Sequence, residues 1–149
     1  MILQQFLDNF HTCLVSCSLL ARNHLRLYDN GEPEGSKHHP SCLVGAVNTE
    51  CRIQDLLETA RQRAKLLSDS QYPNTPPLAV DCLNLEADDP TTIREVRVPC
   101  VPHHLDFVLT EVLKNAFRAV CERHLDEVDP PAVKAFVVRR GGNVVIKVT

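Results

Sequence analysis

The segment at 105–122, LDFVLTEVLKNAFRAVCE, carries the residue types and spacing that could do chemistry. Glu111, Lys114, Asn115, Arg118 and Glu122 recur at steps that place them on one face of an α-helix. An amide oxygen can ligate Mg²⁺, cations can offset phosphate charge, and a carboxylate can accept the proton of a hydroxyl. The face is therefore a candidate nucleotide site. The same spacing also fits a solvated helix surface with weak ion pairs, and spacing alone leaves both interpretations open.

A helix from Pro102 to about His124 is expected to position this face. Proline suits the first helical turn, and the run Asp129-Pro130-Pro131 lies beyond the end of the pattern. Asn115 is a poor helix former at a helix centre, which slightly favours a chemical role for it. A second stripe on the same helix is predicted to be buried, formed by Leu105, Val108, Leu109, Val112, Ala116 and Ala119.

Two further helices are predicted from apolar periodicity. The helix at 53–68 carries a stripe of Ile53, Leu56, Leu57, Ala60, Ala64 and Leu67. The helix at 3–27 has the spacing of a bundle helix that packs on near-parallel partners. Its seam consists of Leu3, Leu7, Phe10, Leu14, Cys17, Ala21 and His24, so His24 is expected to be a packed residue. A loop rich in Gly, Pro and charge is expected at 29–42.

Four strands are predicted, at 78–82, 93–98, 132–139 and 143–149. The first two are expected to pair antiparallel around a turn at Asp88-Asp89-Pro90. The last two are expected to form a hairpin around Gly141-Gly142, because paired glycines accept the positive backbone angles of tight turns. The predicted fold class is α+β, with a layered α/β sandwich that has one open side from residue 46 onward.

The composition excludes several classes of function. The 149 residues carry a formal net charge of −3, which argues against a nucleic-acid-binding protein. No stretch approaches the ~18 apolar residues of a membrane span. The seven cysteines form no CxxC pair, so we expect free thiols in a reducing compartment rather than a disulfide framework or zinc site. The run Lys37-His38-His39 is interpreted as part of a solvated loop.

Several segments together resemble a known family. TEVLKNAFRA at 110–119, with the lead-in VPHHL at 101–105, resembles the N-box of the mitochondrial pyruvate and branched-chain ketoacid dehydrogenase kinases. FLDNF at 6–10 and Asn23-His24 are similar to a bundle helix of these kinases. GAVNTEC at 45–51 and AKLLSD at 64–69 are similar to the first helix of their ATP-binding domain. VVIKVT at 144–149 resembles the strand that leads into their first glycine box.

This resemblance implies a GHKL-type ATP-binding fold, shared with histidine kinases and DNA gyrase. It implies ATP and Mg²⁺ as cofactors and serine phosphorylation of a 2-oxoacid dehydrogenase subunit in the mitochondrial matrix. Glu111 would be the general base and Asn115 the magnesium ligand, while Lys114, Arg118 and Ala119 would line the nucleotide site. The resemblance also implies a homodimer that docks on lipoyl domains of the acyltransferase core.

The resemblance divides the chain into the last part of a helical bundle at 1–28, a linker at 29–45 and the first half of the ATP-binding domain at 46–149. The aspartate-glycine box that holds adenine would begin after Thr149, so the chain is expected to be one piece of a longer kinase. The chain also departs from the family at Leu14 and Cys17, where arginines are usual. That departure leaves allosteric and docking details open.

Two alternatives to a kinase remain. One is a non-catalytic interaction partner, or relic, of such a kinase, because this chain has no adenine-binding box. The other is a histidine kinase or a different GHKL ATPase, which is disfavoured because the first helix has no typical phosphoacceptor histidine. The stretch from Asn48 to Cys51 and the loop before Gly45 weakly favour the pyruvate enzyme over the branched-chain enzyme as substrate.

Overall fold

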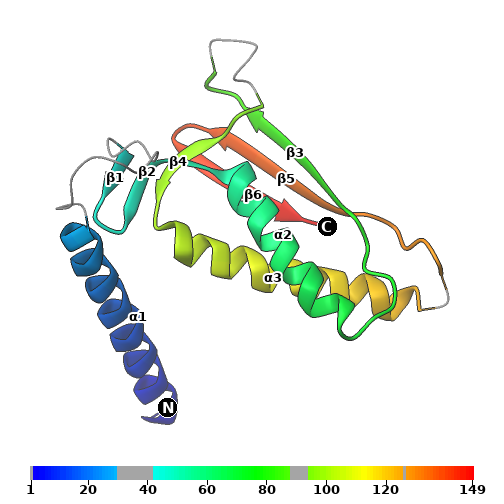
Figure 1. Cartoon of the computed structure of the whole chain (residues 1–149), viewed down its shortest axis with the longest axis horizontal. Helices are drawn as coiled ribbons and strands as arrows, with labels where there is room; N and C mark the ends of the chain where they lie inside the picture. The colour runs from blue at the N-terminus through cyan, green and yellow to red at the C-terminus, as the bar shows by residue number, and fades with distance from the viewer. Residues whose placement is uncertain (1, 30–41, 88–93, 126) are drawn as a thin grey trace. The chain divides into compact units, whose positions relative to one another are not determined.

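The computed structural model describes residues 2–29, 42–87, 94–125 and 127–149 (Figure 1). These residues form three helices and two small sheets, which confirms the α+β class. Two compact units are present, Met1–Thr49 and Glu50–Thr149. The predicted domain boundaries at 28 and 45 stay predictions. The loop predicted at 29–42 falls mostly on residues 30–41, including the Lys37-His38-His39 run. These residues and the predicted turn at 88–90 lie outside the described residues. The elements are α1 (Ile2–Asp29), β1 (Leu43–Val44), β2 (Val47–Arg52), α2 (Ile53–Asp69), β3 (Leu78–Asn84), β4 (Arg97–Cys100), α3 (Pro102–Arg123), β5 (Val133–Arg140) and β6 (Asn143–Val148).

Helix α1 of the first unit confirms the helix predicted at 3–27. Its apolar seam is largely uncovered within this unit: Leu3 is 70% exposed and Leu14 is 53% exposed. His24 is exposed as well, so its prediction as a packed residue is wrong for the described part of the chain. A helix with this exposed seam gains little burial energy, since hydrophobic stabilisation scales with the apolar area removed from water.

The segment at 45–51 forms part of a β-hairpin. The resemblance of this segment to the first helix of the kinases' ATP-binding domain therefore does not hold for its structure. Strands β1 and β2 pair antiparallel, with Val44 opposite Val47. Gly45 occupies the turn with a φ of 58°, a left-handed conformation that glycine adopts without strain. The β-branched residues Val47 and Thr49 then favour an extended backbone over a helix.

Replacing Gly45 by alanine is expected to destabilise the first unit. The left-handed backbone alone costs an alanine about 1–2 kcal/mol. A Cβ atom at this position would also lie 1.6 Å from Oδ1 of Asn23. That oxygen accepts a hydrogen bond of 3.1 Å from the Ala46 amide, so it cannot move away without losing the bond. Thermal unfolding followed by circular dichroism measures the effect.

The variant Gly45→Ala/Asn23→Ala separates the two causes. Removing the Asn23 side chain relieves the clash and leaves only the backbone strain. The double variant is therefore expected to lose less stability than the sum of the two single variants. Strict additivity would contradict the contact between Asn23 and Gly45.

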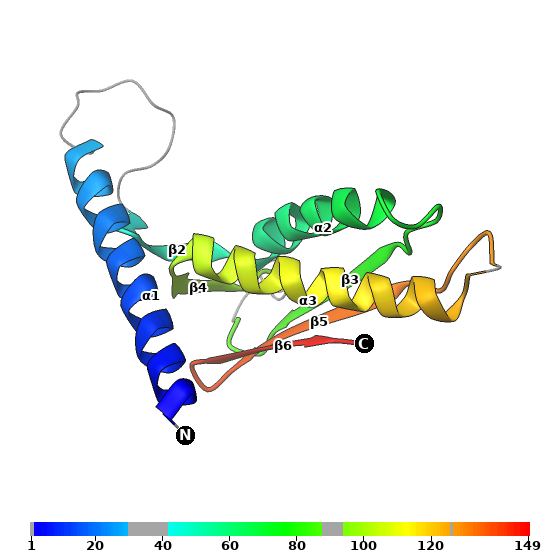
Figure 2. The same cartoon turned by 90° about the horizontal axis from the view of Figure 1, so that it is seen from below.

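The second unit is built around the sheet with order β3-β5-β6. Helices α2 and α3 lie side by side on one face of this sheet (Figure 2). The core between them contains Ile53, Leu57, Ala60, Ala64, Val96, Leu109, Leu113, Phe117, Val133, Ala135 and Val137. The predictions of α2, α3 and the β5–β6 hairpin are confirmed, and Gly141 and Gly142 have the positive φ angles of 59° and 73° that the hairpin turn requires.

The predicted antiparallel pairing of the strands at 78–82 and 93–98 is wrong. β3 instead pairs in parallel with β5, with Leu78 opposite Val133. β4 belongs to the other sheet, whose order is β1-β2-β4. The connection from β3 to β5 contains α3, as parallel strands require, and this crossover allows α3 to cover the sheet. The sheet therefore has helices on one face and remains open on the other, as predicted.

The face of α3 that was predicted to be buried is partly wrong. Val108 is 53% exposed, Val112 is 42% exposed and Ala119 is exposed. The buried residues are Asp106, Leu109, Thr110, Leu113, Phe117 and Cys121. Since α3 packs against both α2 and the sheet, its buried face is rotated towards Leu113 and Phe117. On α2, Leu67 is likewise 50% exposed, and Ser68 takes the last buried position.

Glu86 ties the β5–β6 hairpin to the end of β3. Its carboxylate accepts hydrogen bonds from the Gly142 amide at 2.7 Å and from Nε of Arg139 at 2.9 Å. These two bonds, the backbone bond first, hold the pKa of Glu86 below its ordinary value of 4.5. The ionised form is thus the one that stabilises the folded state.

Glu86→Gln is therefore expected to lower stability at pH 7 and to have a smaller effect at pH 3. The folded pKa lies below the unfolded one, so the contribution is fully present above about pH 4.5 and is lost as the pH falls through the folded pKa. Melting temperatures of the chain and the variant at both pH values measure this. A difference that stays constant with pH would contradict the assignment. Arg139→Gln should reduce the pH dependence without abolishing it, because the bond from the Gly142 amide remains.

Candidate functional site

The candidate site lies on α3, which packs beside α2. The backbone amide of Ile53, at the start of α2, donates to the carbonyl of Val96 at 3.0 Å, just before β4 leads into α3. Pro102 occupies the first turn of α3, as predicted. Further along, Arg63 of α2 donates to Oδ2 of Asp106 on α3. At the far end, the Tyr72 hydroxyl donates to Glu122 at 3.1 Å. These contacts fix the position of α3 along α2.

The predicted charged face of α3 is present, and its residues pair with one another. Nζ of Lys114 donates to Oε2 of Glu111 at 2.5 Å, and Nε of Arg118 donates to Oε1 of Glu122 at 2.7 Å. These side chains are 36–65% exposed. Exposed pairs of this kind contribute little to stability, so either cation can exchange its carboxylate for a stronger anion at small cost.

A pocket of about 300 Å³ brings three of the five predicted nucleotide-site residues together. Lys114, Asn115 and Arg118 line it from α3, and residues at the end of α2 and in the following turn close the other side. Glu111 is connected to this group through Lys114, whereas the exposed residue Ala119 does not line the pocket. The described residues that line it are Leu67, Ser68, Ser70, Gln71, Tyr72, Lys114, Asn115 and Arg118.

Tyr72 is a pocket residue that the sequence analysis missed. Its hydroxyl shares the Glu122 carboxylate with Arg118. The Arg118 guanidinium, followed by the Tyr72 hydroxyl, holds the pKa of Glu122 below its usual range. Burial, and then the bond to Glu122, raises the pKa of Tyr72. The only sequence signal for this contact is the proline run from Pro73, which ends α2 early enough for the chain to turn back towards α3.

A buried polar cluster supports the N-terminal half of α3. The Asp106 side chain is 8% exposed and pairs with Arg63. Its second oxygen, Oδ1, and Oγ1 of Thr110 are buried without a hydrogen-bond partner. Unpaired buried polar atoms cost free energy, so this cluster restricts which positions of α3 against α2 are stable. Glu111 follows Thr110 directly, and its orientation depends on that packing.

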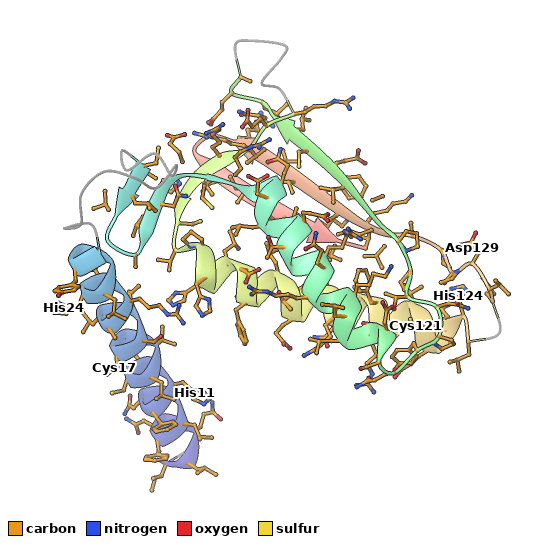
Figure 3. All side chains as sticks on the ribbon, viewed as in Figure 1. His11, Cys17, His24, Cys121, His124 and Asp129 are labelled. Carbon is orange, nitrogen blue, oxygen red and sulfur yellow. The ribbon has the colours of Figure 1, made fainter. Side chains whose placement is uncertain are left out.

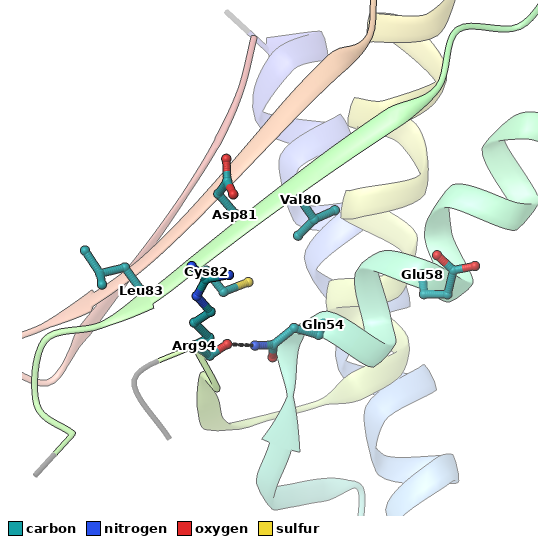
Figure 4. Close-up of a pocket in the computed structure, with 7 residues that line it drawn as sticks. All are labelled: Gln54, Glu58, Val80, Asp81, Cys82, Leu83 and Arg94. Carbon is teal, nitrogen blue, oxygen red and sulfur yellow. Dashed lines mark hydrogen bonds between the residues drawn. The ribbon is translucent and has the colours of Figure 1, made fainter. Parts of the chain in front are cut away.

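A second pocket lies elsewhere, beside the free edge of β3 (Figure 4). It has a volume of about 550 Å³ and is lined by Gln54, Glu58, Val80, Asp81, Cys82, Leu83 and Arg94. Glu58 is already bonded to Arg61 and Gln62, and Nε2 of Gln54 donates to the Arg94 carbonyl at 2.5 Å. Two carboxylates dominate its charge, so it suits a phosphate less well than the α3 pocket does.

The α3 pocket presents two cations and an amide to one space, which is the donor set that a nucleotide phosphate and its Mg²⁺ require. Among the described residues, no group of three or more His, Cys, Asp or Glu side chains is arranged to hold a metal ion. The side-chain oxygen of Asn115 is of the kind that can ligate Mg²⁺ together with phosphate and water oxygens. Within the described part of the chain, no helix is long and apolar enough to cross a membrane.

Comparison with known proteins gives related kinases. No family model matches the chain. It is 30% identical over 147 residues to a probable mitochondrial pyruvate dehydrogenase (acetyl-transferring) kinase of Caenorhabditis elegans, covering 98% of this chain and 34% of that protein. It is 32% identical over 149 residues to isozyme 3 of the mouse kinase, covering 99% and 34%. It is 29% identical over 147 residues to mouse isozyme 1, covering 98% and 32%. The chain thus spans about a third of the length of the curated relatives it matches.

Proposed function

Because the chain is homologous along nearly its whole length to mitochondrial pyruvate dehydrogenase kinases, we propose that it supplies the catalytic helix of an ATP-dependent protein-serine kinase. The proposed substrate is a serine of a 2-oxoacid dehydrogenase subunit, most simply that of the pyruvate enzyme. The proposed location is the mitochondrial matrix. The observation that carries this proposal is the convergence of Lys114, Asn115 and Arg118 in one pocket, next to the carboxylate of Glu111.

Each residue has a distinct proposed role. Lys114 and Arg118 bind nucleotide phosphate oxygens after releasing Glu111 and Glu122, respectively. The carbonyl oxygen of Asn115 would hold Mg²⁺, which would supply neutralisation of the charge that develops during transfer. Glu111, released from Lys114, accepts the proton of the substrate hydroxyl. Ala119 lies one turn beyond Asn115, outside the pocket lining, and its proposed place at the nucleotide site rests on the resemblance. The fold proposed for the second unit is the GHKL-type ATP-binding sandwich.

A direct assay tests the catalytic proposal. The purified chain is incubated with Mg·ATP labelled in its terminal phosphate and with a 2-oxoacid dehydrogenase complex. Serine labelling that disappears with Glu111→Gln and Asn115→Ala would support a kinase. Equal labelling by the chain and by both variants would contradict the proposed roles and point to a contaminating kinase.

Asn115→Ala gives a second, independent measurement. We expect Mg²⁺-dependent ATP binding to fall by about tenfold or more, because contacts of this kind to charged groups contribute about 1.5–3 kcal/mol. Folding stability is expected to rise slightly, by up to about 0.7 kcal/mol, because alanine is the better helix former at an exposed position. Calorimetry and urea unfolding report the two effects. The control is Asn74→Ala, an exposed asparagine outside both helices.

A second candidate function is a non-catalytic partner of a longer kinase. The observation that favours it is the pairing of Lys114 with Glu111 and of Arg118 with Glu122. These pairs neutralise the charged face of α3, so neither cation is free for phosphate. In that case the chain binds a full-length kinase of this family, or the lipoyl domain of the acyltransferase core, and transfers no phosphate. Co-purification with a kinase subunit, together with no labelling in the assay above, would select this function.

A further inference from the structure

Two cysteines on α1 form an exposed pair of neighbouring thiols. Cys13 and Cys17 lie one helical turn apart, and their Sγ atoms are 4.0 Å from each other in a shared hydrogen bond. Cys13 and Cys17 are the two described cysteines whose side chains are exposed. Figure 3 shows Cys17 projecting from the middle of α1, between His11 and His24. The proposed kinase mechanism uses neither thiol.

The helix geometry disfavours a disulfide between these two residues. Side chains four positions apart on a helix have Cβ atoms roughly 5–6 Å from each other. A disulfide needs a Cβ–Cβ distance of about 3.5–4.5 Å. Closing the bond would therefore distort or unwind the turn that contains Ser16. An ion that bridges the sulfurs does not require this distortion.

The sulfur separation fits chelation instead. A tetrahedral ion with metal–sulfur bonds of about 2.3 Å holds its sulfurs roughly 3.8 Å apart, close to the observed 4.0 Å. Among the described residues, however, no third His, Cys, Asp or Glu completes a metal site. The fitting ligand is thus a thiophilic ion that two protein sulfurs satisfy, rather than zinc with its usual four protein ligands.

We propose that Cys13 and Cys17 form a bidentate site for a thiophilic metalloid ion, with an organic trivalent arsenical as the ligand, because two protein sulfurs complete its valence. For phenylarsine oxide, two As–S bonds form and the As–O bond breaks. The two thiol protons leave with the oxygen as one water molecule. Arsenic stays trivalent, so the reaction needs no oxidant or reductant.

The test mixes the intact chain with one equivalent of phenylarsine oxide in an excess of a monothiol, followed by intact-mass measurement and proteolytic mapping. We expect one arsenical per chain, bound to the peptide that carries both cysteines. Cys13→Ser and Cys17→Ser should each weaken binding by about 10²-fold or more, because the second thiol acts at a high effective concentration. Both cysteines are exposed, so serine at either position should leave the helix folded. Circular dichroism verifies that α1 is retained.

Two controls separate spacing from thiol number. Cys51 hydrogen-bonds to Cys100, but burial raises the pKa of Cys51 to about 12, so Cys51→Ser should leave binding unchanged. Cys17→Ser combined with Val15→Cys keeps seven cysteines but turns the second thiol away from the first, and it should not restore binding. An adduct that survives Cys17→Ser, maps to Cys51 and Cys100, or is restored by Val15→Cys would overturn the site.

Discussion

Glu111→Gln is expected to lower serine phosphorylation by about 10²–10⁴-fold, because a carboxamide cannot accept the proton of the attacking hydroxyl. The side chain keeps its size, and only the pair with Lys114 is lost, which costs a few tenths of a kcal/mol at this exposed position. The fold and the binding of Mg·ATP should therefore be retained. The rate of phosphate transfer at saturating ATP is the quantity to compare.

The matched control is Glu58→Gln. Glu58 also sits on an exposed helix surface and pairs with a cation three residues away, Arg61, at 2.6 Å. It lies on α2, outside the proposed nucleotide site, so its replacement should leave the transfer rate within about twofold of wild type. If both variants lost activity equally, the role of Glu111 as a base would be untenable, and the loss would reflect general damage to charge or folding.

Phe117→Ala is expected to destabilise the second unit by about 3–5 kcal/mol. Phe117 is 1% exposed and is the largest fully buried side chain of the described residues. It contacts the core that α2, α3 and β5 share, so its loss leaves a cavity at their junction. Typical domains have only about 5–15 kcal/mol of stability, so much of the unit's stability would disappear. Urea unfolding followed by circular dichroism measures the change.

Phe107→Ala is the control for this prediction. It removes the same ring from the same helix, but Phe107 is 62% exposed. The expected change is within about 0.5 kcal/mol. Similar losses for the two variants would mean that α3 is rotated relative to its packing in the structure, and the proposed direction of Glu111 and Asn115 would then be wrong too.

The helices and the β5–β6 hairpin could be predicted because their signals are local. Apolar periodicity identified α1, α2 and α3, and Gly141-Gly142 identified the turn. The parallel pairing of β3 with β5 has no local signal, because its partners are far apart in the chain. The β1–β2 hairpin was assigned to a helix because its strands are short and the resemblance took precedence over Val47, Thr49 and the glycine turn.

The candidate site divides in the same way. Helical spacing alone placed Lys114, Asn115 and Arg118 together, and the structure brings them to one pocket. The face that α3 buries was predicted about one position off. Its rotation depends on contacts with α2, such as the pair between Arg63 and Asp106, and a single helix pattern does not contain these. Tyr72 could not be found for the same reason, since it reaches Glu122 from fifty residues away.

The parallel pairing of β3 with β5 also governs the order in which the second unit can fold. Leu78 and Val133 are about fifty-five positions apart, so β3 has to wait for the whole of α3 before it finds its partner. The β5–β6 hairpin needs only local contacts and can form within microseconds. During synthesis, β3 therefore leaves the ribosome as an unpaired strand. Its Val80 and Leu83 are 41% and 40% exposed even in the folded unit. This interval is when the chain is most vulnerable to aggregation and most dependent on chaperones.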